Sequence, residues 1–172
     1  MSERNRKFKN LMQQTIDINE LNEYSTKVYE YLLSNNKELI EHISLFSSDF
    51  GKKYITIKLE SPNKEEQTYL YFLSENNELT VGFSNYHRHY DGFADLDFEV
   101  EIKNAINCFY NILNEELLVL CAGGGTTMLL SKEAINTIES GQKLENFKYD
   151  YCIKFYVTSW SGKHDRIFKN PY

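Results

Sequence analysis

The chain has 172 residues, and only 2 of these are proline, the residue that most strongly interrupts helices and strands. It also lacks internal repeats and low-complexity linkers, so nothing in the sequence marks a domain boundary. A chain of about 150 residues can bury roughly 70% of its unfolded surface in a single core. We therefore expect one domain over residues 1–172, with the polar residues 1–15 forming an N-terminal extension.

Cysteine is scarce as well. The 3 cysteines, Cys108, Cys121 and Cys152, are odd in number, widely spaced and set among apolar neighbours. This pattern disfavours a disulfide framework and predicts reduced, buried thiols. A catalytic thiol is the alternative interpretation.

Long apolar runs are missing too. The longest covers residues 117–122, which is too short to cross a bilayer. The first ten residues are polar and charged, without the apolar stretch that forms the centre of a signal peptide. The sequence thus predicts a cytoplasmic protein that does not contact a membrane.

Basic residues are outnumbered: 19 Lys and Arg face 25 Asp and Glu, for a net charge of −6. Binding to nucleic acid depends mainly on neutralising phosphates with Lys and Arg, so we expect no nucleic-acid partner. The charge favours a cationic partner instead, although acidity of this size also serves only to keep soluble proteins apart.

Aromatic residues are abundant, with 13 Tyr and 11 Phe, and they supply material for a packed core. Apolar residues at helical spacing predict helices near 18–33 and near 98–114. Asp17 and Glu20 form a capping box at the start of the first helix. Ser131 should cap a short third helix through Ile138. Residues 37–48 fit either a helix or a strand. Alternating or ring-rich patterns predict strands at 55–59, 69–73, 79–83, 117–121, 126–130 and 149–157.

This order of elements is typical of hairpins with helices held to one side. We therefore predict an α+β domain: mainly an antiparallel sheet of about six strands, with helices packed on one face.

Two of the 4 histidines, His87 and His89, follow the third strand and precede Asp91. If the strand from Leu79 continues without a bulge, these side chains share the face of Val81 and converge. With His164 they form a candidate metal site; the alternative is that the histidines only hydrogen-bond neighbouring backbone groups.

Further polar residues are candidates for binding a partner. Asp95 and Asp97 lie at the expected positive end of the helix near 98–114, where carboxylates also have a purely structural use. The only tryptophan, Trp160, stands among polar and charged residues at the end of the last strand, where it could anchor an interface or cap the core. With the histidine segment they make a candidate binding set: His87, Arg88, His89, Asp91, Asp95, Asp97 and Trp160.

Four segments carry a resemblance to a known family. They are residues 81–83 (VGF), 87–91 (HRHYD), 113–116 (LNEE) and 159–165 (SWSGKHD). Over about residues 79–166 the chain resembles the small immunity proteins of bacterial polymorphic-toxin systems. The resemblance implies a cytoplasmic α+β protein that binds and blocks a cognate toxin domain without doing chemistry or needing a cofactor. Many such toxins are basic nucleases, which the net charge of −6 would complement.

Two other functions fit the same residues. The first is a metal-dependent hydrolase or phosphoesterase, in which His87, His89, Asp91 and perhaps His164 hold an ion that activates water. The second is a homo-oligomeric structural module with the ring-rich strands at its interface.

Overall fold

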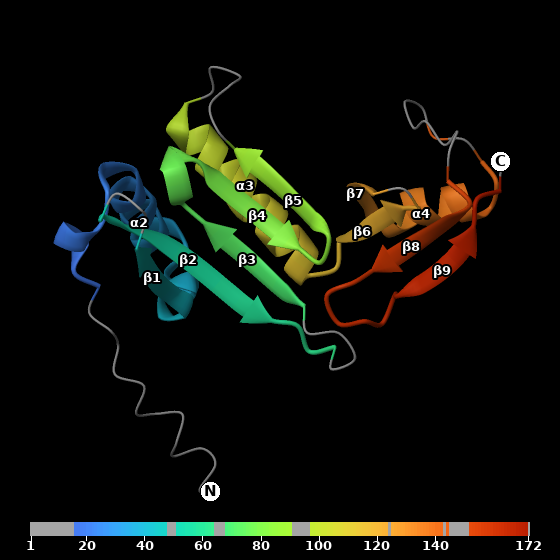
Figure 1. Cartoon of the computed structure of the whole chain (residues 1–172), viewed down its shortest axis with the longest axis horizontal. Helices are drawn as coiled ribbons and strands as arrows, with labels where there is room; N and C mark the ends of the chain where they lie inside the picture. Colours follow the sequence, from blue (N-terminus) through green and yellow to red (C-terminus); the bar gives the residue numbers. More distant parts are fainter. Residues whose placement is uncertain are drawn as a thin grey trace, which may run out of the picture.

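The computed structural model describes residues 16–47, 51–63, 68–90, 97–123, 125–142, 144 and 152–171. In these residues a five-stranded and a four-stranded antiparallel sheet lie side by side, and each is packed against helix (Figure 1). The α+β class predicted from the sequence is confirmed. The strands divide between two sheets, whereas the sequence pattern suggested one sheet.

The first sheet is a meander of five consecutive strands in the order β1-β2-β3-β4-β5. Along β2 and β3 inward side chains alternate with outward ones, and the inward Ile55, Ile57, Leu70 and Phe72 are fully buried. This period of two places every second residue on the opposite face. The strands are β1 Ile43–Ser47, β2 Lys53–Glu60, β3 Tyr69–Leu73, β4 Leu79–Phe83 and β5 Tyr86–Tyr90.

Two helices, α2 Glu23–Asn35 and α3 Phe98–Leu113, cover one face of this sheet (Figure 1). Helix α3 contacts β3, β4 and β5, while α2 contacts β2. No described helix covers the opposite face (Figure 1), which we call the outer face. No helix in the described part of the chain has both the length and the apolar character needed to cross a membrane.

The first helix begins later than the sequence pattern predicts. Asp17 does accept a hydrogen bond, from the Asn19 amide at 3.0 Å, but it caps only the 3-10 turn η2 Ile18–Glu20. The chain then extends, and Leu21 forms an isolated bridge with Lys53 before Asn22 caps α2. A buried position beside β2 thus interrupts what reads as one helix.

The segment after α2 combines the two structures that the sequence pattern left open. It forms the 3-10 helix η3 Lys37–His42 and then strand β1. A third 3-10 turn, η4 Glu75–Asn77, connects β3 to β4, with Asn76 and Asn77 at positive φ.

Strand β4 ends at Phe83, so the condition under which His87 and His89 were expected to share the face of Val81 is not met. The chain reverses at Ser84 and Asn85, where Ser84 has a φ of 54°, and β5 returns alongside β4. His87 and His89 pair across from Gly82 and Thr80. They therefore lie on the outer face, opposite the core side chains of β4.

The second sheet has the order β7-β6-β8-β9 and buries its own core against α4. Ser131 caps α4 as predicted, accepting from the Ala134 amide at 3.2 Å. The last strand, β9, is absent from the sequence prediction, and the predicted strand at 149–157 begins outside the described residues. The elements are β6 Leu117–Ala122, β7 Thr126–Ser131, α4 Lys132–Glu139, β8 Lys154–Thr158 and β9 Arg166–Lys169.

The β8–β9 loop joins the two sheets. The Trp160 ring packs against the buried Phe83 of β4, with ring centroids 5.8 Å apart. The Ser61 hydroxyl donates to the Trp160 carbonyl at 2.6 Å. On the other side of the loop, the Ser161 amide donates to the Glu115 carboxylate at 2.7 Å. Residues from β4, the end of β2 and the α3–β6 turn thereby meet on one loop.

Internal hydrogen bonds fix the shape of the same loop. The Asp165 carboxylate accepts from the Ser159 amide at 2.6 Å and from the Ser159 hydroxyl at 2.9 Å. Its second oxygen accepts from the Asn63 side chain at 3.1 Å. The SWSGKHD motif thus has a structural use in holding the two sheets together.

Candidate functional site

The two predicted histidines lie side by side on the outer face near its β5 edge. Their ring centroids are 5.2 Å apart, and both side chains are exposed. His89 Nδ1 lies 2.8 Å from a Glu78 carboxylate oxygen and 3.0 Å from the Thr80 hydroxyl. His89 is therefore tied to its neighbours on β4 and the preceding turn.

Among the other charged candidates, Arg88 does not share the face of the histidines. Arg88 projects to the opposite face of β5, where its guanidinium lies 5.1 Å from the centre of the Tyr90 ring. Asp97 is exposed at the N-cap position of α3, and its side chain makes no capping hydrogen bond. Asp91 and Asp95 lie outside the described residues.

Trp160 and His164 both belong to the junction between the sheets. Trp160 is partly buried against the core of the first sheet, which matches the core-capping alternative. His164 Nε2 lies 3.5 Å from the Glu115 carboxylate. Among the residues that the structure describes, no three His, Cys, Asp or Glu side chains are placed to hold a metal ion together.

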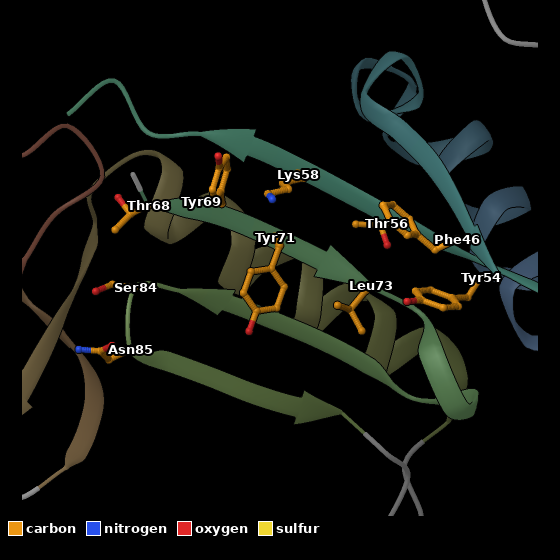
Figure 2. A pocket seen from close by; sticks show the side chains of 10 residues that line it. All are labelled: Phe46, Tyr54, Thr56, Lys58, Thr68, Tyr69, Tyr71, Leu73, Ser84 and Asn85. Carbon is orange, nitrogen blue, oxygen red and sulfur yellow. The ribbon is translucent and has the colours of Figure 1, made fainter. Parts of the chain in front are cut away.

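The outer face also carries a groove with a cavity volume of about 620 Å³. Figure 2 shows its side chains standing on the sheet, with helix on the far side of the strands. Pockets of about 300–1,000 Å³ are typical of ligand and anchor sites. We call this the outer groove, and define it by the residues that line it: Phe46, Tyr54, Thr56, Lys58, Thr68, Tyr69, Tyr71, Leu73, Ser84 and Asn85.

The centre of the groove is a tyrosine lying over a glycine. Tyr71 of β3 and Gly82 of β4 are cross-strand partners, and a Cβ at Gly82 would overlap the end of the Tyr71 ring, including a contact of 2.6 Å to Cε1. Only glycine leaves this space. The ring can therefore lie low over β4, and its burial raises the pKa of the Tyr71 phenol.

One wall carries a cation held against an aromatic ring. The Lys58 ammonium of β2 lies 3.6 Å from the centroid of the Tyr69 ring of β3. Lys58 is also the cross-strand partner of Tyr71, so Tyr69 is its diagonal neighbour. An ammonium over a ring face is stabilised by the ring quadrupole, which restrains an otherwise flexible side chain.

A pair of aromatic rings closes the other end of the groove (Figure 2). The rings of Phe46 and Tyr54 stack with centroids 6.2 Å apart and an interplanar angle of 27°. They come from paired positions on β1 and β2. Phe46 remains 50% exposed, which is unusual for phenylalanine and leaves apolar surface accessible to a partner.

The groove does not show in the sequence because its residues come from three strands, β1, β2 and β3, from the residue before β3 and from the turn after β4. The available signal was the set of outward-facing residues on two predicted strands. On β2, Tyr54, Thr56 and Lys58 alternate with buried residues, and on β3, Tyr69 and Tyr71 do the same. Outward aromatic residues, where charged ones are usual, indicate a surface meant to be covered.

Comparison with known proteins finds no matching family model, no similar curated protein and no similar solved structure.

Proposed function

We propose that this chain is a non-enzymatic cytoplasmic immunity protein that binds a cognate bacterial toxin domain and blocks it by occlusion. The observation that carries the proposal is the outer groove, an aromatic depression on a sheet face that no described helix covers. The motif resemblance and the net charge of −6 support the same class of function.

The groove has the physical properties of a protein-binding surface. Rigid aromatic side chains dominate the energetics of most interfaces, because they bury a large area while losing little rotamer entropy. Here Phe46, Tyr54, Tyr69 and Tyr71 stand on paired strands, which fix them before the partner arrives. Such preorganisation lowers the entropic penalty of binding.

Charge has a separate role in this proposal. The net charge of −6 accelerates the encounter with a basic toxin domain through the long-range field of the whole protein. Contacts at the groove then set the lifetime of the complex. Asp97, exposed at the start of α3, is one source of that field.

Co-expression with the toxin candidate tests the proposal. The C-terminal domain encoded directly upstream of this gene is expressed in bacteria alone, with the wild-type protein, and with Tyr71→Ala. We expect growth arrest from the domain alone, full rescue by the wild type and reduced rescue by the variant. Arrest that the correctly folded wild type does not relieve, or an upstream gene that encodes no toxic domain, contradicts the proposal.

One observation favours a second function, a metal-dependent hydrolase: the rings of His87 and His89 lie next to each other on an exposed face. Under this proposal, purified protein reloaded with zinc, iron or manganese retains one ion per chain, and His89→Ala loses it. Wild type that retains no ion after reloading, measured by elemental analysis, eliminates the hydrolase.

A further inference from the structure

The outer groove has a definite charge character that the net charge of the protein conceals. Of the ten residues that line it in the described part of the chain, Lys58 alone is charged. The others are aromatic, aliphatic, hydroxyl-bearing or amide-bearing. A protein with a net charge of −6 thus presents a cation in this groove.

The Lys58 ammonium is positioned to meet a ligand. It is exposed, it lies over the Tyr69 ring, and no carboxylate of the described residues forms an ion pair with it. Glu60 stands on the same face two residues further along β2, opposite Tyr69, but does not line the groove. An anion that enters the groove therefore meets Lys58 without competing with a wall carboxylate.

Flat apolar surface surrounds this cation on several sides. Figure 2 shows Lys58 between Tyr69 at one end and the Phe46 and Tyr54 pair at the other, with Tyr71 across from it. Aromatic rings pack favourably on other rings in offset or edge-to-face geometry. The hydroxyl and amide groups of Thr68, Ser84 and Asn85 add polar atoms at the Tyr69 end.

We infer that the outer groove takes an aromatic side chain of the partner that stands beside a carboxylate, with the ring on the tyrosines and the carboxylate on Lys58. This inference rests on the proposed function and names the chemistry of the partner's anchor. The toxin domain is basic overall under that proposal, so its anchor is a local acidic and aromatic feature within a basic surface. The complementarity of Lys58 to that carboxylate adds specificity to the aromatic contact.

Three small probes with the same ring and different charge test the inference. N-acetylphenylalanine carries one negative charge, N-acetylphenylalaninamide is neutral, and phenylalaninamide carries one positive charge. Each is titrated into the full chain and followed by backbone amide NMR shifts. We expect saturable shifts at Thr56, Lys58 and Tyr71, and binding of the anion about 1.4- to fivefold tighter than the neutral probe, the range of an exposed ion pair. The cation should bind most weakly.

Two variants assign the charge preference to one residue. Lys58→Gln should abolish the difference in affinity between the anionic and neutral probes. Lys103→Gln removes an exposed lysine on α3, across the sheet from the groove, and should preserve the wild-type preference.

The outcomes separate this inference from the proposed function, because the probes bind without any toxin domain. Equal affinity for all three probes, preference for the cation, shifts outside the groove, or no saturable binding by the folded wild type each overturns the inference. Toxin rescue by wild type alongside any of these results leaves the immunity function standing with a different anchor. Failed rescue with the expected probe order leaves the groove chemistry standing without that function.

Discussion

The ring of Tyr71 occupies the space that a side chain at Gly82 would need, and the two residues face each other across β3 and β4. This arrangement lets the Tyr71 ring lie over β4 within the outer groove. Because the overlapping atoms belong to the far end of a side chain, the ring can rotate away if it is displaced. The contact therefore controls the shape of the groove more than the stability of the fold.

Gly82→Ala should change the groove without unfolding the protein. The new methyl group displaces the Tyr71 ring into solvent, at a loss of about 1 kcal/mol in the free energy of unfolding. The pKa of the Tyr71 phenol should fall back toward its ordinary value, because burial is what raises it. Absorbance titration of tyrosinate and chemical denaturation measure the two effects. Gly123→Ala is the matched control, since its Cβ would meet nothing closer than 3.4 Å. An equal loss of free energy of unfolding in both variants would contradict an overlap between the new methyl group and the Tyr71 ring.

Alkaline pH should destabilise the protein through its buried phenols. Burial raises the pKa of Tyr24, Tyr71, Tyr86 and Tyr90, and burial together with the hydrogen bond to Glu38 raises that of Tyr110 to about 12. A group with a raised folded-state pKa contributes stability below its unfolded pKa and loses it as pH rises. The free energy of unfolding should therefore hold up to pH 10.0 and decline from there through about 12.

Denaturation at a series of alkaline pH values checks this decline. Parallel absorbance titration should show some tyrosines ionising late in the folded protein and at their ordinary pKa in urea. Identical tyrosine titrations in the folded and unfolded protein would refute the account of the buried phenols.

Glu115 should stabilise the junction between the sheets, and this stabilisation should weaken at acid pH. Burial opposes its ionisation, but hydrogen bonds from Ser161 and the charges of His164 and Lys132 lower its pKa overall. Glu115→Ala should lose about 1.5–3 kcal/mol in the free energy of unfolding at neutral pH, the range for hydrogen bonds to a charged group. A lowered carboxyl pKa contributes stability above the unfolded pKa and loses it as pH falls. The deficit should thus shrink below the ordinary pKa of 4.5.

Denaturation of Glu115→Ala and of Glu116→Ala gives the comparison, because Glu116 is the exposed neighbour. A deficit that stays constant from neutral to acid pH argues against the charge-based part of this account.

Trp160 should report on the two sheets at once. Its ring lies on Phe83 of the first sheet, while its backbone belongs to the loop that follows β8 of the second. If this contact makes the sheets one cooperative unit, tryptophan fluorescence and far-UV circular dichroism should give coincident unfolding transitions. Trp160→Ala should lower the free energy of unfolding by about 2–4 kcal/mol, whereas Ile153→Ala, at an 81% exposed position, should change it little. Separate transitions in the wild type would mean two independent domains.

Steering and anchoring should appear in different rate constants. Under the proposed function, Asp95→Lys with Asp97→Lys slows association with the toxin domain and weakens its salt dependence. Tyr71→Ala should instead accelerate dissociation, because it removes a central aromatic contact. Surface plasmon resonance at low and high salt separates the two. Association kinetics that the charge reversal leaves unchanged at both salt concentrations count against electrostatic steering.

Much of the fold could be predicted from local patterns. Helix α3, the hairpin of β6 and β7, and the Ser131 cap of α4 follow from apolar periodicity, a glycine turn and a capping side chain. These signals are local, so distant contacts do not change them. Helix α2 shows the limit, since its first predicted residues became a 3-10 turn and an extended bridge to Lys53.

The candidate site could not be predicted, for two physical reasons. The turn at Ser84 and Asn85 lacks glycine, although Ser84 adopts a positive φ, so the assumption that the strand from Leu79 continues through the histidines is an error. That error reverses the face of every residue beyond it, His87 and His89 included. The groove itself depends on which strands are neighbours, and this is set by long-range packing.

The central claim is that the outer groove is the surface that binds the partner. Backbone amide NMR spectra of this protein, recorded with and without the toxin domain encoded beside its gene, test the claim directly. We predict that the largest changes fall on β2, β3 and β4 around Lys58 and Tyr71, with small changes on α3 and α4. Changes confined to the four-stranded sheet or to the helix-covered side would contradict it.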